Sequence, residues 1–82
     1  MSSELTMARG KLAELNKRYK ELDIAASQDV STARSLLDPY ADPVTNIKID
    51  EAQAVVNRLW SELKEMVSIE IKMRQIKTDI GE

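Results

Sequence analysis

The chain of 82 residues contains no cysteine, no histidine and no phenylalanine, and it has only two glycines. The missing cysteine excludes a disulfide-stabilised scaffold. Without cysteine and histidine, the usual ligands of zinc, haem and iron–sulfur clusters are absent, and so are the side chains of Ser–His and Cys–His catalysis. Two isolated glycines, Gly10 and Gly81, cannot form a phosphate-binding glycine loop. We therefore expect no catalytic residues, no cofactor and no metal site, and a protein that is not an enzyme.

Long apolar runs are also missing. The longest uninterrupted runs are two or three residues, such as residues 54–56, whereas a membrane span needs roughly 18. The first residues show no basic segment followed by an apolar run, so no signal peptide is predicted. We expect a cytoplasmic protein with no membrane partner.

A regular apolar pattern predicts a first long helix over residues 3–37. Its apolar side chains recur in steps of three and four, which is typical of one face of a helix. A doubled step of four, from Ala26 to Val30, predicts a local unwinding of the helix. The polar residues 27–31 leave open a break there because their helix propensity is low. Pro39 ends the helix, since the residue before a proline is pushed out of helical geometry. The series is Leu5, Ala8, Leu12, Leu15, Tyr19, Leu22, Ala26, Val30, Ala33 and Leu37.

Residues 38–49 are predicted to form a turn, because they contain two prolines and several short acidic side chains. A second helix is predicted over residues 51–80, with Asp50 and Gln53 forming a capping box at its start. Gly81 suits the position just after its end. Two helices of similar length joined by this turn fold back antiparallel. The chain is therefore predicted to be one all-α domain, residues 1–82, with the architecture of a coiled-coil-like helical hairpin.

The second helix carries more apolar surface than one partner helix covers. The contact between the helices is predicted to join Leu12, Leu15 and Leu22 to Leu59, Leu63, Met66 and Met73. A second flank points away from the first helix and consists of Val56, Trp60, Val67 and Ile71. This flank either packs under the 38–49 turn within one chain or drives self-association, most simply of two hairpins into a four-helix bundle. We expect a homodimer with Trp60 near its centre, because tryptophan is enriched at the centres of interfaces.

The distribution of basic residues supplies an alternative function. The net charge is −2, from 12 basic and 14 acidic residues, yet residues 1–20 carry five basic and two acidic side chains. An antiparallel hairpin brings eight basic residues to one end, where they could contact phosphates of a nucleic acid. Acidic residues share that end, so a solvated helix surface explains the same charges. The candidate contacts are Arg9, Lys11, Lys17, Arg18, Lys20, Lys72, Arg74 and Lys77.

One segment carries a resemblance to known proteins. A helix ending in Leu36-Leu37-Asp38-Pro39-Tyr40 is followed by an acidic turn, by the start Asp50-Glu51-Ala52-Gln53-Ala54 and by a C-terminal Ile-Lys-x-x-Ile-Gly pattern. Over residues 34–81 this resembles small uncharacterised helical proteins encoded by Mu-like transposable prophages. The resemblance implies a phage or prophage context and assigns no activity.

These features together predict a small non-enzymatic interaction module, an adaptor, assembly factor or regulator. Its expected partners are a second copy of itself and another protein of unknown identity. The alternative is an accessory factor that binds nucleic acid through the basic end of the hairpin.

Overall fold

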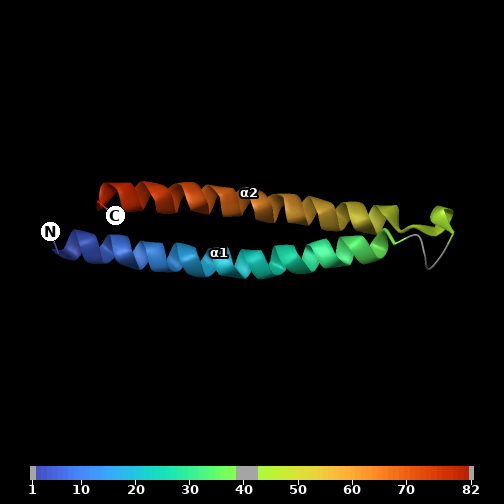
Figure 1. Ribbon diagram of the computed structural model, residues 1–82, viewed down its shortest axis with the longest axis horizontal. Coiled ribbons are helices and arrows are strands. Elements are labelled where there is room, and N and C mark those ends of the chain that lie inside the picture. Colours follow the sequence, from blue (N-terminus) through green and yellow to red (C-terminus); the bar gives the residue numbers. More distant parts are fainter. Residues whose placement is uncertain (1, 39–42, 82) are drawn as a thin grey trace.

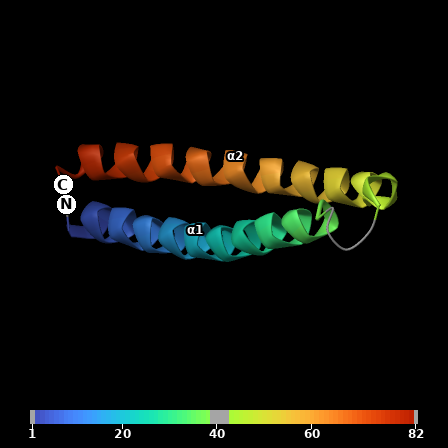
Figure 2. The ribbon, with the colours of Figure 1, turned by 45° about the vertical axis from the view of Figure 1, so that its right-hand side comes forward.

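The computed structural model describes residues 2–38 and 43–81. It contains two long α-helices, α1 (Ser2–Leu36) and α2 (Ile49–Asp79), with a short 3-10 helix, η1 (Val44–Asn46), between them. The two α-helices run side by side in opposite directions, so the start of α1 and the end of α2 lie at the same end of the molecule (Figures 1 and 2). The Cα positions extend over 64 × 16 × 14 Å. The predicted all-α helical hairpin is confirmed.

The proline-containing segment separates the two helices as expected. At the end of α1, the Leu37 amide donates to the Ala33 carbonyl at 3.1 Å, and the Asp38 amide donates to the Ser35 carbonyl at 3.4 Å. The helix stops there because Pro39 disfavours helical geometry at the residue before it. Residues 39–42 of the predicted turn lie outside the described part of the chain.

The start of α2 differs from the prediction. The helix begins at Ile49, and its N-cap residue is Lys48, which makes no side-chain capping hydrogen bond. The predicted capping box at Asp50 and Gln53 is therefore wrong. The Lys48 carbonyl already accepts the Ala52 amide at 2.9 Å, so Asp50 lies inside the first turn. There its carboxylate and that of Glu51 interact favourably with the positive end of the helix dipole.

The end of α2 follows the prediction. Gly81 adopts a positive φ of 77° directly after the helix, a conformation that glycine reaches without the steric cost of a side chain. The Ile80 amide donates to the Ile76 carbonyl at 3.0 Å, and the Gly81 amide donates to the Thr78 carbonyl at 3.2 Å. These bonds satisfy carbonyl groups that would otherwise lack a partner at the helix end.

The two helices pack against each other along a heptad seam. Its residues, each buried or half-buried, recur along each helix in alternating steps of three and four. The hydrophobic core cluster of the seam joins Leu22 and Ala26 to Met66 and Ile69. We call the whole set the seam. On α1 it comprises Leu5, Ala8, Leu12, Leu15, Tyr19, Leu22, Ala26, Asp29, Ala33 and Leu36, and on α2 Ala52, Val55, Leu59, Glu62, Met66, Ile69, Met73, Ile76 and Ile80.

The seam corrects three sequence predictions. Val30 and Leu37 are about two-fifths exposed, whereas Asp29 and Leu36 take the seam positions. The heptad repeat therefore continues without the predicted unwinding, and α1 is continuous through residues 27–31. Leu63, predicted in the contact between the helices, is 47% exposed. Between Leu59 and Met66 the seam position is occupied by Glu62. Leu63, one residue further along the helix, therefore lies on the side of α2.

Candidate interaction surface

The side of α2 presents a continuous row of large apolar side chains to solvent. Their exposed fractions run from 45% at Val56 to 65% at Trp60. All four residues predicted for self-association belong to this row, and Leu63, predicted in the contact between the helices, joins them as a fifth. We call this set the α2 stripe. It consists of Val56, Trp60, Leu63, Val67 and Ile71.

The α2 stripe follows its own heptad pattern. Val56, Trp60, Leu63 and Val67 recur in steps of four, three and four. In a heptad helix this places their array about 100° around the axis from the seam. A helix of a four-helix bundle contacts two neighbours in roughly such directions. The pattern is that of a helix with a second helical neighbour, while α1 covers only the seam.

The surface over the stripe is hollowed into a shallow groove of about 610 Å³. Apolar side chains form its floor, and Lys64 and Lys72 border it. The Lys64 Nζ atom lies 5.7 Å from the centre of the Trp60 ring, within the range of a cation–π interaction. The groove is lined by Trp60, Leu63, Lys64, Val67, Ser68, Ile71 and Lys72.

No comparable row exists on the described part of α1. The large exposed apolar residues on α1 and directly after it are Met7, Ile24, Val30 and Leu37, and they are separated by six positions or more. A groove of about 650 Å³ near the end of α1 has a more polar lining that includes Ser27, Ser31 and Ser35. Single exposed apolar residues are normal on protein surfaces. The candidate interaction surface therefore belongs to α2.

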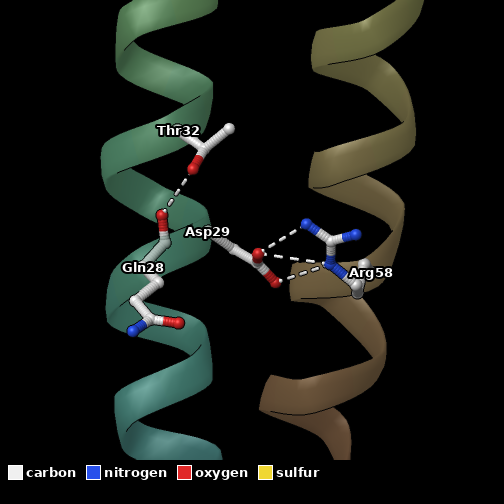
Figure 3. Close-up of polar contacts among 4 residues, drawn as sticks. All are labelled: Gln28, Asp29, Thr32 and Arg58. Atoms are coloured by element: carbon white, nitrogen blue, oxygen red, sulfur yellow. Dashed lines mark hydrogen bonds and ion pairs between the residues drawn. The ribbon is translucent and has the colours of Figure 1, made fainter.

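A polar layer interrupts the seam where Asp29 of α1 faces α2. Asp29 is only 6% exposed, and Arg58 forms a fork with it (Figure 3), donating from Nη2 to Oδ1 at 2.7 Å and from Nε to Oδ2 at 3.1 Å. Nearby, the Thr32 hydroxyl donates to the Gln28 carbonyl at 2.9 Å. The arginine supplies the opposite charge and the donors that a buried carboxylate requires.

Glu62 completes this layer from the seam of α2. Its Oε1 atom is buried and has no hydrogen-bond partner among the residues that the structure describes. The adjacent Asp29 carboxylate, together with burial, raises the pKa of Glu62, whereas the Arg58 hydrogen bond holds the pKa of Asp29 below its usual value. Two carboxylates can only accept hydrogen bonds. Two ionised carboxylates side by side disfavour a second negative charge, which is the physical reason for the raised pKa of Glu62.

Two further polar contacts flank the seam. Arg18 binds Glu65 through Nε at 2.7 Å and also reaches Glu21 at 3.6 Å. On the other side, the Tyr19 hydroxyl donates to Glu70 at 2.7 Å, and this bond raises the pKa of Tyr19. Both join side chains separated by about 50 positions in sequence, so they fix the register of the two helices.

The eight candidate nucleic-acid contacts lie at one end of the hairpin, as predicted, because α1 begins where α2 ends (Figure 1). They do not form one surface. Relative to the seam, some of them lie on one side, some on the other side and some on the outer faces of the helices. Arg18 already forms ion pairs with two carboxylates, Glu21 and Glu65. Binding to a phosphate backbone favours a contiguous basic face, so the geometry gives this alternative little support.

Two other kinds of site can be considered within residues 2–38 and 43–81. No group of three acidic side chains there is arranged to hold a metal ion. Neither helix in that part of the chain carries a stretch long and apolar enough to cross a membrane.

Comparison with known proteins gives no further guide to the site. The chain matches no protein-family model, no curated protein and no solved structure. The α2 stripe, held in place by the seam, remains the candidate functional surface of the chain.

Proposed function

We propose that the chain is a small non-enzymatic interaction module, an adaptor, assembly factor or regulator, that acts through protein–protein contacts made by the α2 stripe. A second copy of the chain is its first partner, and the product is a homodimer that resembles a four-helix bundle. The observation that carries the proposal is the stripe itself, five large apolar side chains in one row that are each 45–65% exposed. Contiguous apolar patches of this kind mark interaction sites.

The magnitude of the effect supports a weak to moderate dimer. Full burial of a large apolar side chain contributes about 1.5–3 kcal/mol, and about half of each stripe side chain is still available. Two stripes in contact then contribute about 8–15 kcal/mol, against a cost of association of about 4–15 kcal/mol. A dissociation constant on the order of micromolar falls within this balance.

A phage or prophage context is part of this proposal, and its support is the resemblance of residues 34–81 to proteins of Mu-like prophages. This part of the proposal stands on the resemblance alone. A protein partner other than a second copy would use the same α2 stripe, because the other exposed large apolar side chains on the described residues do not form a comparable row.

Sedimentation velocity over a range of concentrations tests the proposal. The wild-type chain is expected to shift from monomer to dimer with rising concentration, and Trp60→Glu is expected to stay monomeric with its helix content kept. Ile24→Glu is the matched control, because Ile24 is 61% exposed on α1 and lies outside the stripe. Wild-type chain that stays monomeric, or equal effects of the two variants, would contradict self-association through the stripe.

The nucleic-acid alternative is tested by fluorescence anisotropy with a labelled duplex. Micromolar binding that weakens steeply as salt is added would favour that function. The expected result is no salt-sensitive binding, because the basic residues are spread around the hairpin.

A further inference from the structure

The spacing of the α2 stripe constrains how a second copy can dock. Val56, Trp60, Leu63 and Val67 are separated by four, three and four residues, and this series is the same in both directions along the helix. Its midpoint lies between Ser61 and Glu62. A symmetric dimer presents the same patch from both copies. If the helices cross in opposite directions, a palindromic row can meet itself layer by layer.

We infer that two copies dock α2 against α2 in antiparallel orientation, with the two-fold axis passing between Ser61 and Glu62. This inference rests on the proposed self-association through the stripe. The axis places Val56 opposite Val67 of the second copy and Trp60 opposite Leu63 of the second copy. Each half of the interface thus forms two apolar layers, and the two-fold axis repeats them.

The charges beyond the stripe favour this orientation over the parallel one. A parallel two-fold dimer places every residue level with its own copy, so Glu70 would lie beside Glu70 and Arg74 beside Arg74. Such pairs of like charge oppose association. The antiparallel axis instead places Arg74 level with Ile49 and Asp50 of the second copy, and Glu70 level with Gln53. At each end of the antiparallel interface, Arg74 then meets an opposite charge and Glu70 meets a neutral side chain, whereas the parallel dimer has both like-charge pairs at one end.

The available area fits a second copy. The five stripe side chains expose on the order of 500 Å² per chain, with about 150–250 Å² taken for a fully exposed large side chain. Two copies together then bury about 1,000 Å², which is the lower limit of a specific interface. The occupant must therefore cover most of the stripe. A second α2 helix covers Val56, Trp60, Leu63 and Val67 with the same row of side chains, while Ile71 lies level with Ala52 of the second copy, outside the palindromic row.

Distances between spin labels distinguish the two orientations. The chain has no cysteine, so Ser61→Cys and Gln75→Cys each introduce one nitroxide site. Both positions are exposed and lie two heptads apart on the same outer face of α2, which makes each the control for the other. Near the axis, the labels at position 61 are expected within about 25 Å of each other. At position 75 they are expected about 40 Å apart or more, from 1.5 Å of rise per residue.

The outcomes separate the orientation from the dimer itself. A short distance at position 61 with a long distance at position 75, in a chain that sediments as a dimer, supports the antiparallel interface. Short distances at both positions in a dimer overturn the antiparallel inference and leave the proposed function standing. A long distance at both positions in a dimer shows contact through another surface and overturns both. A chain that sediments as a monomer at every concentration also overturns both.

Discussion

The division of α2 between seam and stripe predicts opposite behaviour for two leucines. Leu22 on α1 is 4% exposed in the hydrophobic core cluster of the seam, and Leu63 on α2 is 47% exposed on the stripe. Leu22→Ala and Leu63→Ala remove the same atoms, so the difference between them reports burial alone. Sequence reasoning had placed both residues in the contact between the helices.

The expected losses follow from that burial. Leu22→Ala removes buried methyl groups and leaves a cavity, which costs about 2–5 kcal/mol of unfolding free energy. Leu63→Ala removes atoms that are only about half covered and leaves no enclosed cavity, so its cost is about 1 kcal/mol. For a chain of this length the total stability is on the order of 4–12 kcal/mol. Leu22→Ala therefore removes a large share of it.

Urea unfolding followed by far-ultraviolet circular dichroism measures both losses. The comparison is made in a Trp60→Glu background, which we expect to be monomeric, so that loss of the dimer does not contribute to the measured free energy. In the wild-type background, Leu63→Ala is expected to weaken self-association while the helix content stays unchanged. Equal losses for the two alanine variants in the monomeric background would refute the assignment of Leu63 to the stripe.

Two further predictions concern the polar layer of Asp29, Glu62 and Arg58. The positive charges of Arg58 and Arg18 partly oppose the rise in the pKa of Glu62. Because the pKa of Glu62 is raised, the folded chain binds more protons than the unfolded chain above the ordinary pKa of 4.5, so stability is expected to increase as the pH falls from 7 toward that value. Because the pKa of Asp29 is lowered, stability is expected to decrease again when the pH falls below 3.8, the ordinary pKa of aspartate. In thermal unfolding curves, Glu62→Gln should abolish the gain in stability between pH 7 and 4.5 and leave the loss at lower pH. Arg58→Ala leaves Asp29 buried without its cation, so the urea midpoint is expected to fall more at pH 7 than at a pH that protonates Asp29. Arg18→Ala is the control from a more exposed pair, and an equal fall in both variants would contradict the role given to Arg58.

The sequence is sufficient to predict the helical hairpin, for identifiable physical reasons. Prolines at 39 and 43 exclude a continuous helix through the middle of the chain, and glycine at 81 is well suited to the position after a helix end. The apolar steps of three and four identify the face of α1 between Leu5 and Ala26. These are local signals, and each depends on the chemistry of a few neighbouring residues.

The polar layer could not be predicted in the same way. Asp29 and Glu62 are acidic, so apolar periodicity assigns them to solvent and passes to Val30 and Leu63 instead. The burial of Asp29 depends on Arg58, which lies on the opposite helix. Glu62 lies on that same opposite helix, so these contacts join residues that are far apart in the sequence. One signal was present in the sequence. An uninterrupted heptad repeat in each helix requires Asp29 and Glu62 at seam positions.

The stripe was predicted only in part, for a related reason. The apolar arc of α2 is wide enough to serve two neighbours, and its residues do not state where one contact ends and the other begins. Leu63 lies on that boundary. The structure assigns it to the stripe because Glu62 occupies the seam.

The emission of Trp60 on dilution reports directly on self-association through the α2 stripe, because the only tryptophan of the chain is 65% exposed in the hairpin and lies within the proposed interface. We expect blue-shifted emission at high concentration, where the second copy covers the ring, and a red shift on dilution that follows the dissociation of the dimer. The helical circular dichroism signal is monitored in parallel to show that the hairpin stays folded. An emission wavelength that does not change with concentration, in a chain that is folded and monomeric throughout, would contradict self-association through the α2 stripe.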